Sequence, residues 1–282
     1  MFEHVQFSCV DDYTLNGCFY PKQQESNFLP ILIGSATGIR QGFYQAFATW
    51  LSTQGYDVLT FDFRGIGDSL YTSVSQSTAR IQDWGMYDLP AAIDFLLKKT
   101  QADKVLLLGH SAGGQLLGLA HNFAKVEKVI AIAGSSGNVK GLSGRTKLMA
   151  PVMFNLIFPI SSRFKGYAAT KMLGMGENLP KGVGAQWREF CSKPGYVINA
   201  LGKTVDVDYH DAIRCPIISI HATDDEIATE HNVKDFLRIY PNAKTDYISL
   251  EPKALQHKAI GHMLMFKSSH QNIWSVIEQQ LH

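Results

Sequence analysis

The stretch that decides the fold is LLLGHSAGGQLLG, residues 106–118. Its first half is an apolar run of the kind found in strands that are buried on both faces. Its second half is again mostly apolar and favours a helix, which we expect to continue to about Lys125. A histidine and a serine lie between the two halves, flanked by glycines. The stretch therefore predicts a strand, a tight turn and a helix.

The turn contains the pattern G-x-S-x-G, as Gly109-His110-Ser111-Ala112-Gly113. A strand-to-helix turn of this kind holds its serine in a strained conformation at the sheet edge, and glycines two residues away on either side avoid collisions. The N-terminus of the following helix directs backbone N–H groups toward the serine. We predict that Ser111 is a nucleophile and that the Ala112 N–H stabilises an oxyanion. The alternative is a glycine turn whose serine only caps the helix.

Strands and helices alternate along most of the chain. Residues 2–22 favour an N-terminal β-hairpin, and further strands are expected at 31–35, 57–63, 104–109, 128–136, 216–222 and 245–251. Helical periodicity favours helices at 42–54, 84–99, 230–239 and 270–280. This alternation predicts an α/β fold with a mostly parallel, doubly wound sheet.

The alternation is interrupted once, between Gly137 and Asp211, where no strand of the core type is found. We predict that residues 1–136 and 212–282 form the core and that residues 137–211 form a helical cap over the edge of the sheet. The longest apolar stretch, residues 148–160, is too short to span a bilayer, which takes about 20 apolar residues. It favours a helix packed on a core, or alternatively the underside of a substrate lid.

A serine nucleophile needs a base, and the base needs a group that orients it. In this type of sheet the chain order is serine, acid, histidine, with the acid after a late strand. The strand at 216–222 is followed by Asp224 and Asp225, one of which should orient the base. His262 lies between the last strand and the last helix, where the base is expected, with His257 as the alternative.

A second oxyanion donor is expected in the loop after the strand at 31–35. The residues of this loop are small, so that a backbone N–H could approach a substrate closely. We predict the Ala36 N–H, with Ser35 and Thr37 as the alternatives.

Four segments together resemble the α/β-hydrolase superfamily: FDFRGIGDS at 61–69, GHSAGG at 109–114, HATDDEIA at 221–228 and IGHMLMF at 260–266. More narrowly, the chain is similar to a bacterial group of predicted serine hydrolases without an agreed substrate. The resemblance implies the α/β-hydrolase fold and a triad of Ser111, Asp225 and His262. Asp225 is the acid by this match, because it holds the fourth position of the superfamily's G-x-x-D pattern. The His-Gly pair common before the oxyanion loop is replaced by Gly34-Ser35.

These residues predict a serine hydrolase that cleaves an ester or thioester, with no metal or organic cofactor. Apolar residues of the cap suggest a partly apolar small-molecule acyl substrate: Phe154, Leu156, Ile157, Phe158 and Trp187. One alternative is a serine aminopeptidase or amidase, which would need a carboxylate near the cap, such as Glu177 or Glu189, to hold a free amino terminus. The other is a non-catalytic ligand-binding protein on the same fold.

Composition narrows the remaining classes of function. The 282 residues carry a formal net charge of +1 with no block of Lys or Arg, so nothing favours nucleic acid or an anionic membrane as the main partner. The four cysteines are scattered without metal or redox spacing. The N-terminal residues do not form a basic segment followed by an apolar one, so we expect a cytoplasmic protein.

Overall fold

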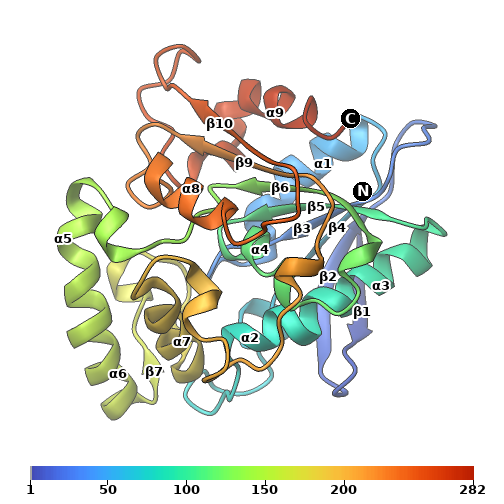
Figure 1. The fold of residues 1–282 in the computed structure, drawn as a ribbon. Coiled ribbons are helices and arrows are strands. Elements are labelled where there is room, and N and C mark those ends of the chain that lie inside the picture. Colours follow the sequence, from blue (N-terminus) through green and yellow to red (C-terminus); the bar gives the residue numbers. More distant parts are fainter. Residues whose placement is uncertain (1) are drawn as a thin grey trace.

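The computed structural model describes residues 2–282, and its centre is one eight-stranded sheet (Figure 1). The strand order is β1-β2-β4-β3-β5-β6-β9-β10. β1 and β2 form an antiparallel hairpin, β2 is antiparallel to β4, and the remaining neighbours are parallel. The strands are β1 (Glu3–Ser8), β2 (Thr14–Tyr20), β3 (Ile31–Gly34), β4 (Val58–Phe61), β5 (Val105–His110), β6 (Val126–Ile132), β9 (Ile217–Ala222) and β10 (Thr245–Leu250). The predicted mostly parallel sheet with an N-terminal hairpin is confirmed.

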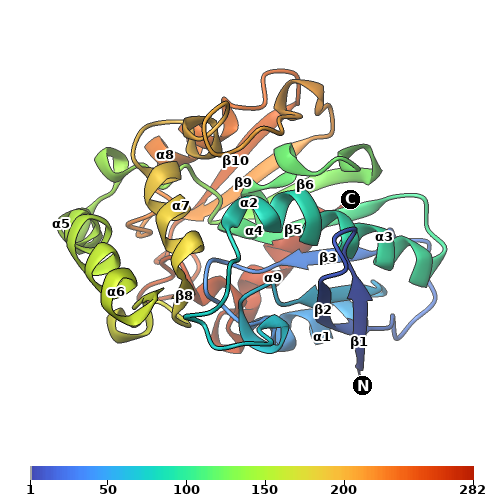
Figure 2. The ribbon, with the colours of Figure 1, turned by 90° about the horizontal axis from the view of Figure 1, so that it is seen from below.

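Helices cover both faces of this sheet. α1 and α9 lie together on one face, where the rings of Phe47 and Trp274 are 5.4 Å apart, and α2 and α3 lie on the other (Figures 1 and 2). The helices of the core are α1 (Gln45–Thr53), α2 (Ile81–Asp83), α3 (Leu89–Thr100), α4 (Ala112–Gln115), α8 (Glu230–Leu237) and α9 (Gln271–Glu278). A π turn, Trp84–Asp88, joins α2 to α3.

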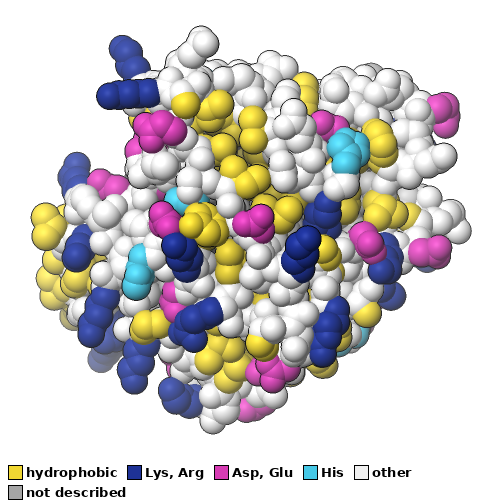
Figure 3. Space-filling view, turned by 45° about the horizontal axis from the view of Figure 1, so that its top comes forward, with side chains coloured by type: hydrophobic (Ala, Val, Ile, Leu, Met, Phe, Trp, Pro, Cys, Tyr) yellow, Lys and Arg dark blue, Asp and Glu magenta, His cyan; other side chains and the backbone are white. Residues whose placement is uncertain are grey.

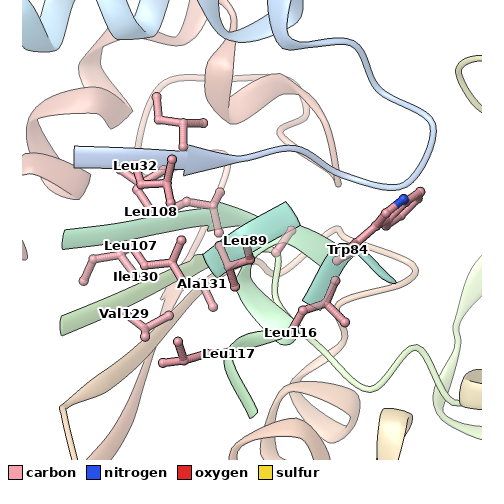
Figure 4. Packing of buried hydrophobic residues seen from close by; sticks show 14 of the residues in the cluster. Leu32, Trp84, Leu89, Leu107, Leu108, Leu116, Leu117, Val129, Ile130 and Ala131 are labelled. Atoms are coloured by element: carbon pink, nitrogen blue, oxygen red, sulfur yellow. The ribbon is translucent and has the colours of Figure 1, made fainter. Parts of the chain in front are cut away.

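The core is centred on the parallel strands β3, β5 and β6. Leu32, Leu107 and Ile130 of these strands are fully buried. Figure 4 shows their side chains beside Leu89 of α3 and Leu117, which follows α4. Because helices cover both faces of the sheet, the side chains on both sides of each of these strands are buried. This explains why these strands are continuous apolar runs in the sequence.

The helix expected after Ser111 is much shorter than predicted. α4 ends at Gln115, and only short 3-10 turns follow it before β6. The Gly118 carbonyl, which a longer helix would use internally, accepts a hydrogen bond from the Tyr209 N–H at 2.7 Å. A Cβ on Gly118 would lie 2.1 Å from His210 Nε2, so that segment is fitted to its neighbours rather than to a helix. Several glycines, which are weak helix formers, lower the cost of this departure.

We call residues 137–211 the cap segment. It contains α5 (Gly144–Val152), a π turn (Met153–Ile157), α6 (Phe158–Lys165) and α7 (Lys181–Cys191), with the two-residue strands β7 (Tyr167–Ala168) and β8 (Leu179–Pro180). α5, the π turn and α6 run on without a break as one long helix at the outer edge of the molecule (Figures 1 and 2). Within residues 2–282, no helix combines the length and apolar character that crossing a bilayer requires.

Candidate active site

Ser111 occupies the sharp turn between β5 and α4. Its backbone has φ 49° and ψ −119°, a conformation that residues with side chains rarely adopt. The Ser111 N–H donates to the Ile132 carbonyl of β6 at 2.8 Å, which helps to hold the turn against the sheet. Strain of this kind at a serine is characteristic of nucleophile turns.

Two glycines make the turn possible. A Cβ on Gly109 would lie 2.2 Å from the Gly114 Cα, and a Cβ on Gly113 would lie 2.2 Å from the Gly34 carbonyl. The first turn of α4 is therefore pressed directly against the ends of β3 and β5. This close approach brings the Ala112 N–H, which has no partner inside the helix, to the same sheet edge as Ser111.

His262 and Asp225 form the second part of the site. The Asp225 carboxylate lies 2.7 Å from His262 Nδ1 and also accepts the backbone N–H groups of Ile227 and Ala228. Burial alone would raise the pKa of Asp225, but His262 and the two backbone donors outweigh it, so this pKa lies below its ordinary value. Since an ionised carboxylate can only accept, His262 Nδ1 carries the proton and Nε2 is left as the acceptor.

Asp224 is exposed, and it contacts the loop before His262 rather than the His262 side chain. Its two oxygens accept the backbone N–H groups of Ile260 and Gly261, each at 2.9 Å. Asp224 does not cap the helix that follows it, because the N-cap of α8 is Thr229. Asp224 instead holds the backbone of the loop that carries His262. Its neighbour Asp225 contacts the His262 side chain.

In the loop after β3, the N–H groups of the candidate oxyanion donors have different surroundings. The Ala36 N–H donates to Tyr44 Oη at 2.9 Å, so it is already occupied in this structure. Ala36 and Thr37 both line the same cavity as Ser111, and the N–H of Thr37, one of the two alternatives, has no hydrogen-bond partner among residues 2–282. Thr37 is therefore better placed than Ala36 to supply a second donor. Ser35 is fully buried, and its hydroxyl donates to the Phe61 carbonyl.

His110, the histidine beside Ser111, connects the loop that carries His262 to Tyr44, which in turn contacts the loop after β3. His110 Nε2 is 2.9 Å from the His262 carbonyl, and Nδ1 is 2.9 Å from Tyr44 Oη. Because a carbonyl can only accept, Nε2 carries the proton and the tyrosine hydroxyl donates to Nδ1. Burial lowers the pKa of His110 to about 3, which keeps this ring neutral. The sequence indicated no function for His110 or Tyr44.

Asp62, from the FDFRGIGDS segment, supports the oxyanion loop from behind. Its carboxylate accepts the backbone N–H of Gln41 at 2.7 Å and that of Asp68 at 2.9 Å. Burial raises the pKa of Asp62 to about 6. Arg64 of the same segment is paired with the buried Asp88 at 2.6 Å. The segment therefore acts through structure, by tying the loops after β3 and β4 together.

Ser111 and His262 line one cavity of about 170 Å³. Its other walls come from the oxyanion loop, the cap segment and the loops near the triad: Ala36, Thr37, Ile39, Gly174, Met175, Gly176, Trp187, Ile227 and Met263. A second cavity of about 510 Å³ shares Met175 and Ile227 with the first. Met149, Met153 and Met172 also line it, and we call it the methionine groove.

The apolar residues of the cap segment that the sequence suggested as substrate contacts differ in their positions. Of the five proposed as substrate contacts, only Trp187 lines the Ser111 cavity. Phe154 and Phe158 are buried and pack edge-to-face against each other, so they form the core of the cap segment. Leu156 is exposed and Ile157 is half-buried. Methionines add to the apolar lining of both cavities, and the sequence did not indicate their roles.

Three further candidates are placed away from the Ser111 cavity. Glu177 pairs with Arg40 at 3.3 Å, and Glu189 accepts a hydrogen bond from the Thr204 hydroxyl. The His257 ring stacks on His270, and its Nε2 lies 2.7 Å from Asn272 Oδ1. None of the three lines the cavity that holds Ser111 and His262. Among residues 2–282 there is also no cluster of three His, Cys, Asp or Glu side chains with metal-site geometry.

Comparison with known proteins found a family model and a curated relative that each match part of the chain. A family model described as serine aminopeptidase, S33, matches residues 36–170. A tear acid lipase-like protein of Mesocricetus auratus is 31% identical over 129 residues, covering 43% of this chain and 32% of that protein. The match thus spans about a third of the length of this curated relative.

Solved structures are similar over the whole chain. A soluble variant of monoglyceride lipase from Saccharomyces cerevisiae has a TM-score of 0.65 and 17% identity, covering 99% of this chain and 96% of that one. An esterase from Pyrococcus furiosus has a TM-score of 0.62 and 17% identity, covering 100% and 90%. The strand order, the turn at Ser111 and these likenesses show that the chain has the α/β-hydrolase fold. The narrower bacterial group stays a prediction.

Proposed function

We propose that this chain is a serine hydrolase that cleaves an ester or thioester of an apolar acyl group through an acyl-enzyme. One observation carries the proposal. Ser111 and His262 line the same largely apolar cavity, while Asp225 accepts a hydrogen bond from the far nitrogen of His262. A nucleophile, a base and an orienting acid are the minimum set for serine-based acyl transfer.

The mechanism follows from the protonation states. His262 Nε2 removes the hydroxyl proton as Ser111 Oγ attacks the acyl carbonyl, and Asp225 stabilises the charged ring that forms. The N–H groups of Ala112 and Thr37 donate to the tetrahedral oxyanion. The imidazolium then returns its proton to the departing alcohol or thiol. Water attacks the acyl-enzyme with His262 again as base, which releases the acid and restores Ser111.

The methionine groove supports an apolar acyl chain as the substrate group. It adjoins the Ser111 cavity at Met175 and Ile227, so a chain bound at Ser111 can extend into it. Together the two spaces fall within the range of roughly 300–1,000 Å³ usual for ligand sites. Methionine side chains are unbranched and adaptable, which suits a flexible chain of variable length. Residues 137–211 act as the cap in this proposal.

The aminopeptidase alternative is favoured by the description of the matched family model. It requires a carboxylate that can hold a free amino terminus near Ser111. Within residues 2–282, no Asp or Glu lines the Ser111 cavity. Glu226 lines the methionine groove, but its oxygens accept the N–H groups of Arg145 and Thr146 at the start of α5. These contacts favour the ester or thioester over the peptide.

Labelling with a fluorophosphonate tests the enzyme itself. We expect wild type to be labelled and folded Ser111→Ala to stay unlabelled. A wild-type protein that is folded but unlabelled would instead support the non-catalytic binding protein.

A second assay separates the esterase from the aminopeptidase. p-Nitrophenyl esters of acyl chains from two to twelve carbons are compared with aminoacyl anilides. We expect turnover of esters with a preference for the longer chains. Turnover of the anilides alone would overturn the esterase proposal in favour of the aminopeptidase.

A further inference from the structure

The long helix of the cap segment exposes a row of large apolar side chains. Most of the chain's exposed large apolar residues lie on this helix or just after it, and we call them the cap face: Leu148, Met149, Val152, Leu156, Ile160, Phe164 and Met172. Large apolar side chains are normally exposed singly on a protein surface. A continuous set of this kind marks a surface that something else covers.

The π turn in the middle of the helix keeps this row together. Five of the residues are spaced four apart, from Leu148 to Phe164. In a regular α-helix of 3.6 residues per turn, such a row drifts steadily around the axis. The π turn at Met153–Ile157 holds more residues per turn and reduces the drift. The exposed row therefore stays close to one side of the helix, while Met153, Phe154 and Phe158 are buried on the other.

Positive charge surrounds the cap face. Residues 137–176 contain none of the chain's 25 Asp and Glu residues but six of its 26 Lys and Arg residues. The six are all exposed, and none forms an ion pair within residues 2–282: Lys140, Arg145, Lys147, Arg163, Lys165 and Lys171. Figure 3 shows dark blue and yellow side chains intermixed along the left edge, where α5 and α6 lie in Figure 1.

We propose that the cap face binds the surface of an anionic lipid bilayer, with its apolar side chains in the acyl boundary and its cations at the headgroups. An exposed apolar row flanked by Lys and Arg is the pattern by which helices lie in a membrane interface. Each cation near an anionic leaflet adds to the attraction. A second copy of the chain is a poorer partner, because a symmetric contact would place the six cations of one copy against those of the other.

The position of the methionine groove agrees with this partner. Met149 and Met172 belong to the cap face and also line the groove that adjoins the Ser111 cavity. An apolar substrate held in the bilayer could therefore enter the site without crossing water. The proposal itself does not depend on turnover, since binding to lipid is measured without a substrate.

The test uses the full chain and sedimentation with vesicles of phosphatidylcholine containing 30% phosphatidylserine. Phe164 and Val10 provide a matched pair, because they are 81% and 78% exposed and Val10 lies in the β1–β2 turn, outside the cap segment. We expect Phe164→Glu to lower the partition coefficient at least tenfold and Val10→Glu to leave it unchanged. Arg163→Gln with Lys165→Gln should also weaken binding, whereas Lys98→Gln with Lys253→Gln should not. Binding should fall with added salt and be weak on phosphatidylcholine alone.

Two results would overturn the proposal. One is a folded wild-type chain that does not sediment with the anionic vesicles, or that loses binding equally in both glutamate variants. The other is a wild-type dimer, seen by light scattering, that Phe164→Glu converts to a monomer without any vesicle binding, which would assign the face to a second copy. Fluorophosphonate labelling of the same samples is a separate readout, so an inactive chain that still binds vesicles would refute only the proposed function.

Discussion

Replacing each of the two adjacent carboxylates with an amide should have very different effects on turnover. In Asp225→Asn the amide can still accept the N–H groups of Ile227 and Ala228 through its oxygen. Its NH₂ group then faces His262 Nδ1, at a position where the carboxylate oxygen lies 2.7 Å away. Since two donors cannot share a hydrogen bond, the ring must move its proton to Nε2. His262 can then no longer remove the proton of Ser111.

The expected size of this effect is large. Loss of the correct tautomer in a serine triad lowers kcat by roughly 10⁴-fold. That factor corresponds to about 5 kcal/mol of transition-state stabilisation, at 1.36 kcal/mol for each factor of ten. The overall fold should persist, because the amide has almost the same shape as the carboxylate.

Asp224→Asn is the matched comparison. An amide oxygen can keep one of the two bonds that Asp224 accepts from Ile260 and Gly261, while the other is lost. A hydrogen bond to a charged group contributes about 1.5–3 kcal/mol, which sets the upper limit of the stability loss. We expect kcat/KM to fall by about tenfold or less, since the loop loosens but the tautomer of His262 is unchanged.

The assay measures steady-state hydrolysis of a p-nitrophenyl ester, with urea unfolding of each variant as the check on stability. If Asp224→Asn alone abolishes turnover, or Asp225→Asn keeps more than a tenth of it, the assignment of the acid is wrong. Equal losses in both variants, each with lower stability, would mean that the carboxylates act only on the fold.

Three further predictions concern the buried connections and the groove. Tyr44→Phe leaves the Ala36 N–H and His110 Nδ1 without partners. At about 1–3 kcal/mol for each unpaired group, the free energy of unfolding measured in urea should fall by about 2–6 kcal/mol. An unchanged value would contradict the inferred hydrogen bonds. The next prediction concerns the dependence of stability on pH. The pKa of His110 is about 3 in the folded chain and near 6.5 in the unfolded chain. As the pH falls below about 6.5, His110 therefore takes up a proton only in the unfolded chain, which favours unfolding. Wild type should therefore lose about 2 kcal/mol more stability than His110→Gln between pH 7 and pH 5, whereas the exposed control His121→Gln should follow wild type. Met149→Glu should lower the ratio of kcat/KM for dodecanoate to that for acetate, and a constant ratio would place the acyl chain outside the methionine groove.

Local sequence was sufficient for much of the sheet and for the candidate triad. Each core strand is a short apolar run, because it is buried on both faces, and the two-sided burial is visible in the residues themselves. The glycines on either side of Ser111 mark the turn in the sequence, although the need for glycine at Gly113 comes from the close approach of Gly34 in β3. The order of Ser111, Asp225 and His262 could be predicted because the ends of parallel strands meet at one edge of the sheet.

The features that the sequence alone did not decide depend on contacts between distant segments. The sequence favoured Ala36 over Thr37, and only the position of Tyr44 shows that the Ala36 N–H already has a hydrogen-bond partner. Asp224 and Asp225 are neighbours, and their different partners are set by the path of a loop some 37 residues later. The overall charge of +1 conceals a segment, residues 137–176, that carries six cations and no acid, because charges from distant parts of the chain cancel in the sum. The sequence determined which residues could do chemistry, whereas the tertiary structure decided which of them face one another, since hydrogen bonds and burial depend on positions in space.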